Sequence, residues 1–257
     1  MPSYHDNNRR ISLLKGELDA LVQAYGPGYL SSDPLEFPRR YKNPADTEAA
    51  ALICALFAYG NVTSMKAFLE RLLEALGPSP ARALKEGRRV RARPYRFQTA
   101  DDVERFLGGL GRVLKKHGSI EAAFCGVEGD AEARLENLAL ALRRASGRLT
   151  PGLAHLLPLP SSGSACKRWW LFLRWVVRKE DGVDLGLWSC LKPADLIIPV
   201  DVHVARMARR LGLAKRKSPD RLFAIEVTES LRRLCPEDPV KYDFALARPG
   251  ILKRQSG

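Results

Sequence analysis

Apolar residues recur at helical spacing along most of the chain. The first predicted helix covers residues 11–25 and ends at the turn Gly26-Pro27-Gly28. The second covers about 46–57, with Asp46 or Thr47 as its cap. Because this second helix is apolar nearly all round, we expect it at the centre of the core.

Further helices are predicted over 64–76, 80–87, 99–117, 119–124, 130–146 and 166–178, and one more follows Asp201. No convincing set of alternating strands interrupts them, although Leu196 to Val200 could be mistaken for a strand. The chain is therefore predicted to be all-α, with short connections between neighbouring helices.

Composition adds a strong positive charge to this helical picture. Lysine and arginine number 42 against 29 acidic residues, a formal net charge of +13 at pH 7. Such a surplus favours a polyanionic partner, because each phosphate that a side chain neutralises releases condensed counterions. The alternative is a generally basic surface that keeps the protein in solution.

The five cysteines are scattered along the chain without any C-x-x-C pair: Cys54, Cys125, Cys166, Cys190 and Cys235. This pattern predicts neither a disulfide framework nor a zinc site, and it is typical of a reducing compartment. Residues 1–10 are polar and charged, and the longest apolar run, 49–59, is about half the length of a membrane span. We therefore expect a cytosolic protein that needs no metal or other cofactor.

A turn rich in proline, serine and glycine leads into the predicted helix 166–178. Such a turn exposes unpaired N–H groups, and together with the positive end of the helix dipole it can bind a phosphate. The residues of this predicted phosphate site are Ser161, Ser162, Gly163 and Ser164, and Arg168 in the first turn of the helix is a further expected DNA contact. Lys167 lies in the first turn of the helix, although cations are favoured at the other end by a few tenths of a kcal/mol to about 1.

The segment 198–206, Ile-Pro-Val-Asp-Val-His-Val-Ala-Arg, opens the next informative helix. Asp201 is a natural N-cap, a role worth about 1 kcal/mol whether or not the residue does chemistry. From 203 to 217 the chain holds six basic residues and no acidic one, including Arg206, Arg209, Arg210 and Lys215. A solvated charge run usually explains such a stretch, but its place beside a phosphate-type turn favours a nucleic-acid surface.

A glycine-containing turn with Lys167 at the head of a helix, followed by Val-Asp-Val-His-Val around Asp201, resembles the helix-hairpin-helix (HhH-GPD) DNA glycosylases. This superfamily includes endonuclease III and the 8-oxoguanine glycosylases. The lysine and the aspartate are 34 positions apart (201 − 167), and Gly163 has no partner glycine. Both features look most like the archaeal 8-oxoguanine glycosylase branch. Nearly the whole chain is also similar to a mostly bacterial family of the superfamily, through the stretches 58–60, 95–97, 166–168, the Asp201 segment and 239–246.

The resemblance implies two all-α lobes with a DNA-binding cleft between them. Residues 46–150 would form a central lobe, and residues 1–45 with 151–257 would form the second, which carries the divergent helix-hairpin-helix. Lys167 would attack the anomeric carbon of the damaged nucleotide, and Asp201 would activate it and support the developing cationic sugar. An amine must first lose its proton, which partial desolvation or a neighbouring cation such as Arg168 favours, and a nearby carboxylate can shuttle that proton.

Four other positions have both a functional and a structural interpretation. Trp188 and Trp169 could stack on a flipped base, although aromatic residues at helical spacing more often belong to the core. Asn61 could fill the gap left by the extruded base, or lie in the C-terminal turn of a helix. His203 could orient a phosphate or pack against the turn.

The implied activity is that of a bifunctional DNA glycosylase and AP lyase of base-excision repair. It would remove an oxidised purine such as 8-oxoguanine from double-stranded DNA through a lysine Schiff base, as a monomer in the bacterial cytosol. The endonuclease III type of iron–sulfur cluster is excluded, because only Cys235 lies in the C-terminal region. Alternatives are a monofunctional glycosylase, a non-catalytic DNA-binding protein that senses damage or structure, and a helical scaffold or RNA-processing factor.

Overall fold

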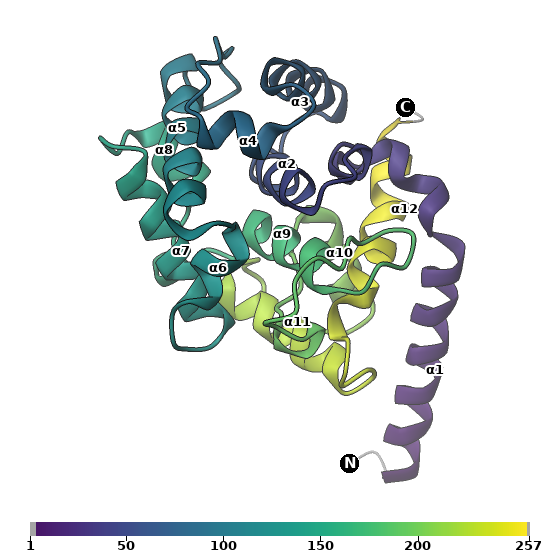
Figure 1. Ribbon diagram of the computed structural model, residues 1–257. Helices are drawn as coiled ribbons and strands as arrows, with labels where there is room; N and C mark the ends of the chain where they lie inside the picture. Colours follow the sequence, from purple (N-terminus) through teal and green to yellow (C-terminus); the bar gives the residue numbers. More distant parts are fainter. Residues whose placement is uncertain (1–3, 256–257) are drawn as a thin grey trace.

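The computed structural model describes residues 4–255, which fold into helices joined by loops (Figure 1). The α-helices are α1 (Tyr4–Ala24), α2 (Pro44–Leu56), α3 (Val62–Leu76), α4 (Pro80–Lys85), α5 (Ala100–His117), α6 (Ile120–Cys125), α7 (Ala131–Ala145), α8 (Pro151–Leu156), α9 (Lys167–Val177), α10 (Val202–Arg210), α11 (Arg221–Arg232) and α12 (Asp243–Gln255). The short 3-10 helices are η1 (Pro27–Ser32), η2 (Pro34–Glu36), η3 (Pro38–Arg40), η4 (Pro160–Ser162), η5 (Pro193–Asp195) and η6 (Pro239–Tyr242). The described part of the chain contains no strand, so the all-α prediction is confirmed.

Short polar side chains fix many of the helix starts. Thr99 and Asp102 form a reciprocal capping box at the start of α5, in which each side chain accepts a hydrogen bond from the other residue's N–H. Single side-chain caps begin α6, α7, α8 and α11, at Ser119, Asp130, Thr150 and Asp220. Thr99, Ser119 and Asp130 stand where the sequence pattern predicted that helices begin, whereas α8, α11 and α12 were not predicted.

The start of α2 corrects the sequence prediction. Its cap is Asn43, whose side chain accepts from Ala45 N at 2.9 Å, and Pro44 occupies the first helical position, which its fixed φ suits. Asp46 is therefore inside the helix and uses its carboxylate elsewhere. It accepts from Ala81 N at 2.9 Å and so ties α4 to α2.

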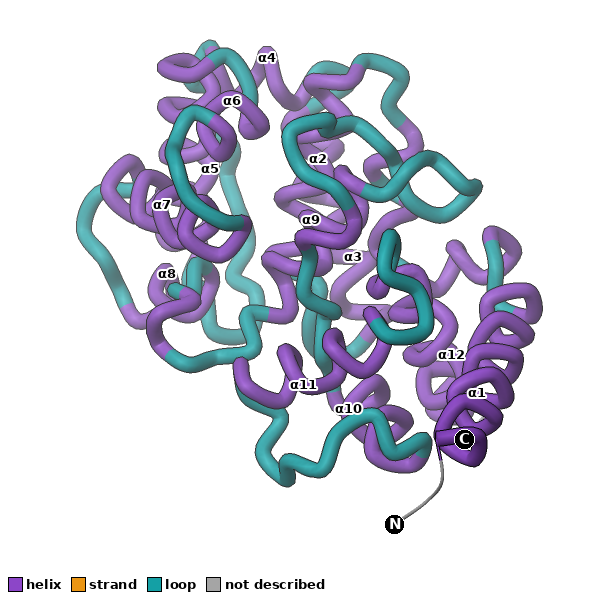
Figure 2. Tube along the Cα trace, turned by 90° about the horizontal axis from the view of Figure 1, so that it is seen from below, coloured by secondary structure: helices purple, strands orange, loops and turns teal. Residues whose placement is uncertain are grey.

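Helices α2 and α9 lie at the centre of the molecule and pack against each other (Figure 1). Residues 49–56 of α2 are fully buried, as predicted, and so are Trp169, Phe172 and Trp175 of α9. Helices α5 to α8 gather on one side of this pair, and α1 and α12 run beside each other on the other side, as both views show (Figures 1 and 2). None of the described helices is both long and apolar enough to cross a membrane.

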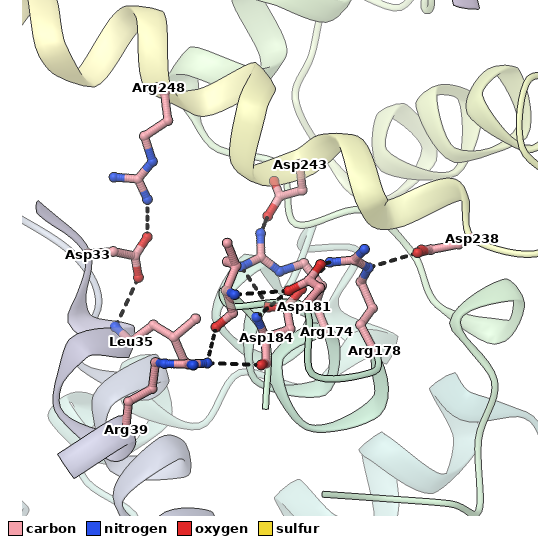
Figure 3. A network of polar contacts seen from close by, with 11 residues as sticks. Asp33, Leu35, Arg39, Arg174, Arg178, Asp181, Asp184, Asp238, Asp243 and Arg248 are labelled. Atoms are coloured by element: carbon pink, nitrogen blue, oxygen red, sulfur yellow. Dashed lines mark hydrogen bonds and ion pairs between the residues drawn. The ribbon is translucent and has the colours of Figure 1, made fainter. Parts of the chain in front are cut away.

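A buried ion network fastens α9 to the segments that follow it (Figure 3). Arg174, on α9, is 1% exposed and lies 2.6 Å from Asp243 and 3.1 Å from Asp184, measured between nitrogen and oxygen. Arg178, one turn later, binds Asp184 and, at 2.9 Å, Asp238. The start of α12 and the long connection 178–201 are thus held against one helix by charge pairs.

The cysteines correct the expectation that none would pair. Cys125, at the end of α6, is joined by a disulfide to Cys190 in the connection 178–201, while Cys54, Cys166 and Cys235 are free thiols. Cys125 and Cys190 are 65 residues apart in the sequence, which gave no sign that they lie close together in the fold.

Candidate functional site

Lys167 and Asp201 lie side by side in one cleft. Lys167 is the first residue of α9, and Asp201 directly precedes α10. Lys167 Nζ lies 3.6 Å from Asp201 Oδ2, and the two side chains are 29% and 22% exposed. Both line a cleft of about 1630 Å³. The structure therefore brings together the two residues that the sequence pattern singled out.

The two oxygens of Asp201 have different tasks. Oδ1 accepts from His203 N at 2.8 Å and from Val204 N at 2.9 Å, which confirms the predicted N-cap. Oδ2 points toward Lys167. Burial disfavours the ionised carboxylate, but the Lys167 ammonium and the two capping N–H groups outweigh it and hold the pKa of Asp201 below its usual range. Asp201 is therefore a fixed anion whose second oxygen is available in the cleft.

The backbone that enters α9 is strained. Cys166 caps the helix in the left-handed conformation, with φ 45° and ψ 35°. Arg96 (φ 51°) is the other described non-glycine residue with positive φ, and both residues line the cleft. A non-glycine residue in this region costs roughly 1–3 kcal/mol, and such strain gathers at functional sites. Burial raises the pKa of the Cys166 thiol to about 11, so this thiol stays protonated at neutral pH and is no nucleophile.

A second carboxylate, Asp243, also lines the cleft, together with its partner Arg174. Burial raises the pKa of Asp243 to about 6; Arg174 opposes the shift, and the nearby charge of Asp201 adds to it. The cleft thus combines one lysine, a carboxylate with a lowered pKa and a carboxylate with a raised pKa. Neighbouring carboxylates whose pKa values are pushed apart are a frequent arrangement in acid–base catalysis.

Another part of the cleft wall is aromatic. The rings of Tyr59 and Phe97 stack at 6.3 Å between centroids, and the His155 ring lies 4.6 Å from that of Phe97. Burial and the neighbouring Arg168 and Arg96 lower the pKa of His155, so its ring is neutral at pH 7. Flat apolar surface beside charged groups is what a site for a nucleobase requires.

Arg168, which we expected to bind DNA, is used inside the fold. Its guanidinium donates to the carbonyl oxygens of Leu56, at 2.8 Å, and of His155, and it lies 4.9 Å from the Tyr59 ring centroid. Burial lowers the pKa of Arg168. This arginine therefore ties the start of α9 to the end of α2 and shapes the aromatic wall.

The predicted phosphate turn is largely occupied by internal contacts. Ser161 donates from both its N–H and its hydroxyl to the carboxylate of Glu136 on α7, at 3.0 and 2.7 Å. The N–H groups of Ser162 and Gly163 donate to carbonyls within the turn. Ser164 lines the cleft, and its hydroxyl accepts from Cys166 N at 3.3 Å. Of the four predicted residues, Ser164 is thus the one beside Lys167.

The basic residues after Asp201 are exposed but not equivalent. Arg206, Arg210 and Lys215 have exposed side chains on and after α10. Arg209 instead donates to the carbonyl oxygen of Lys217 at 2.5 Å and covers the ring of Phe223. The outward arginines therefore give a positive face beside the cleft, while Arg209 also braces the loop after α10.

The tryptophans correct the expectation of a base contact. Trp169 is fully buried and donates from Nε1 to Pro158 O at 3.0 Å. Trp188 is 5% exposed and donates to Glu48 Oε1 at 2.8 Å inside the core, next to Phe124. Neither lines the cleft. Burial of their apolar rings stabilises the core, where their N–H groups also find acceptors.

Asn61 and His203 both line the cleft and both have structural roles. Asn61 begins α3 rather than ending α2, because its side chain accepts from Ser64 N at 3.1 Å. This corrects the expected C-terminal turn. His203 is 8% exposed and packs so closely on α12 that a Cβ at Gly250 would lie 2.1 Å from its Nδ1.

The sequence pattern missed four cleft residues: Tyr59, Phe97, His155 and Asp243. Three of them lie in the stretches 58–60, 95–97 and 239–246, and the resemblance of these stretches to a known family was the sequence signal that could have identified them. No such signal marks His155.

One group of residues in the described part of the chain could hold a metal ion: Glu121, Cys125 and Cys190, whose ligand atoms lie within 4.8 Å of one another. The two sulfur atoms are joined in the structure, and none of the three residues lines the cleft. A metal ion at this group would need the disulfide reduced, since thiolates are the ligands.

A search of curated proteins and a search of solved structures found no match to the chain. One family model, described as "Protein of unknown function (DUF2400)", matches residues 33–252. The match includes α2 to α11, Lys167, Asp201 and the whole described cleft lining. The chain therefore belongs to the DUF2400 family.

Proposed function

We propose that this protein is a DNA glycosylase with AP lyase activity that removes an oxidised purine from double-stranded DNA. The observation that carries the proposal is the 3.6 Å approach of Lys167 Nζ to Asp201 Oδ2 within one cleft. The net charge of +13 and the resemblance to helix-hairpin-helix glycosylases support a DNA substrate.

The proposed chemistry uses the pair as nucleophile and anion. The Lys167 ammonium passes one proton by way of Asp201 to the departing base; the freed amine forms a bond to C1′ of the damaged nucleotide as the bond from C1′ to the base breaks, and the base leaves with the bonding electrons. The ionised Asp201 stabilises the positive charge that develops on the sugar. Opening of the sugar ring then gives the Schiff base, from which elimination of the 3′ phosphate cuts the strand.

In this proposal the duplex lies across the cleft, between a lobe formed by residues 46–150 and a lobe formed by the rest of the chain. The flipped base packs against Tyr59 and His155 in the aromatic wall, which the buried tryptophans do not reach. A single chain carries both members of the pair, and in this proposal the protein acts as a monomer.

Borohydride trapping on a duplex that contains 8-oxoguanine tests the proposal. The wild type should give a covalent adduct, and Lys167→Gln should give none. Lys179→Gln is the matched control, because Lys179 is exposed and does not line the cleft. An adduct that persists in Lys167→Gln would refute the role of this lysine.

Asp201→Asn separates chemistry from folding. Asparagine caps helices about as well as aspartate, so α10 should keep its start while the negative charge is lost. We expect single-turnover base release to fall at least about 100-fold, with DNA affinity retained. Base release without trapping would indicate attack by water, and DNA binding without release of any lesion would indicate a binding protein.

A further inference from the structure

The segment between α4 and α5 carries a row of arginines on one face. Val90 and Ala92 are buried at 7% and 8% exposure, whereas Arg89, Arg91 and Arg93 are exposed. This alternation is that of an extended chain, in which successive side chains point to opposite sides. Ala92 N donates to the Glu104 carboxylate at 3.0 Å and so anchors the segment on α5. The three guanidinium groups therefore share the solvent-facing side.

These three arginines stabilise the fold through no ion pair among the described residues. Among the side chains that the structure describes, none forms an ion pair with Arg89, Arg91 or Arg93. Arg88 differs, because it donates to Leu76 O at 2.9 Å. Like charges that form no ion pairs repel each other and oppose folding, and the single Glu104 carboxylate near the row offsets only part of this repulsion, so an anionic partner would stabilise the protein.

The row leads from a groove into the cleft. Arg91 and Arg93, with Arg71 of α3, line a groove of about 400 Å³. Pro94 and Tyr95 also line this groove, and the two residues after them, Arg96 and Phe97, line the cleft that holds Lys167. An extended anion that followed this segment would therefore enter the cleft.

Phe97 is an exposed aromatic residue at the end of the row, and its backbone is held in place. It is 59% exposed, although its position is fixed by a tight turn in which Tyr95 and Gln98 exchange backbone hydrogen bonds of 2.9 Å. Gln98 is buried and donates to Gly152 O at 2.9 Å. Gly60 leaves room for the Arg96 side chain, because a Cβ there would lie 2.7 Å from Arg96 Cδ. Because the backbone of the turn is already held in place, stacking of this ring on a base orders little more than the side chain itself.

We propose that residues 88–97 form a second nucleic-acid-binding surface, on which Arg89, Arg91 and Arg93 bind phosphates and Phe97 stacks on a base beside the cleft. This inference rests on the proposed function in one respect, namely that the polyanion in the cleft is DNA. It adds a path for the strand over the groove next to α3, which is separate from the basic stretch after Asp201.

The phosphate contacts are tested by the salt dependence of binding. The triple variant Arg89→Gln/Arg91→Gln/Arg93→Gln is compared with Lys115→Gln/Lys116→Gln/Arg148→Gln, which removes the same charge at exposed positions outside both cavities. Both are made in the Lys167→Gln background so that no turnover occurs. Each lost phosphate contact reduces the slope of log K against log salt by about 0.9. We expect the arginine triple to lower the slope by roughly 2 to 3 and the control by much less; equal effects would overturn the inference.

The stacking contact is tested with a duplex that carries 2-aminopurine next to the lesion. Phe97→Leu keeps an apolar side chain without a ring, and Phe97→Trp keeps a ring. We expect Phe97→Leu to bind roughly 5- to 150-fold more weakly and to leave the 2-aminopurine fluorescence unquenched, while Phe97→Trp retains both affinity and quenching. Equal behaviour of the two variants would refute stacking by Phe97.

The two proposals can fail separately. If the arginine triple lowers the salt slope but no lesion is ever released, the second surface stands and the glycosylase activity does not. If borohydride trapping succeeds and the triple behaves like its control, the activity stands and the second surface is refuted. Failure of the wild-type protein to bind DNA at low salt would overturn this inference as well.

Discussion

Replacing Arg174 by methionine should be among the most damaging single substitutions in this protein. Arg174 is 1% exposed, and its guanidinium lies 2.6 Å from Asp243 and 3.1 Å from Asp184, which are themselves buried (Figure 3). Methionine fills much of the same space but removes the positive charge. Two buried carboxylates would then lose their shared partner, although Arg178 still binds Asp184.

The size of the effect follows from the burial of the charges. Breaking a buried ion pair by removal of one partner costs about 3–5 kcal/mol, because the remaining charge is left in a poorly solvated place. For a chain of this length each kcal/mol lowers Tm by about 2–4 °C. We therefore expect a loss of roughly 6–20 °C. Protonation of Asp243 in the variant would limit the loss, since its pKa is already raised to about 6.

Urea unfolding followed by circular dichroism measures the free energy, and Arg105→Met is the matched control. Arg105 forms an ion pair with Asp101 at 2.5 Å, but these side chains are 39% and 63% exposed, so its loss should cost less than about 1 kcal/mol. If Arg174→Met costs no more than Arg105→Met, the argument from burial is wrong. Adding Asp184→Asn to Arg174→Met should cost less than the sum of the two single changes, because it removes an uncompensated charge.

Two further predictions concern packing and pH. Gly111→Ala should destabilise the protein by roughly 1–3 kcal/mol, because its Cβ would lie 2.1 Å from the carbonyl oxygen of Leu84, whereas Gly108→Ala in the same helix has room and should be neutral or stabilising in the same urea assay; equal effects would contradict the close contact. The raised pKa of Asp243, about 6, means that the folded state holds its proton more tightly than the unfolded chain. Its stabilising contribution is therefore complete below about pH 4 and is lost as the pH rises through 6, by up to about 3 kcal/mol. The stability of the wild type relative to Asp243→Asn should fall between pH 4 and 7, and a difference that is independent of pH would contradict the shift.

The sequence by itself determined the helical class, the central position of α2 and the N-cap at Asp201. These features depend on local rules, namely apolar spacing and side chains that bond to nearby N–H groups. The same rules failed at α2, where Asn43 and Pro44 outcompete Asp46 as the start, and at α8, α11 and α12, which were not predicted.

Tertiary structure alone decided which distant residues share a site. The pattern around Lys167 and Asp201 suggested a pair, but the folding of the 178–201 connection, held by Arg174 and Arg178, is what brings Nζ and Oδ2 to 3.6 Å. Charge and aromaticity in sequence do not reveal exposure. Trp188 and Arg174 are therefore buried in the core, while Phe97 lies exposed at the cleft, because burial depends on packing between segments that local spacing does not encode.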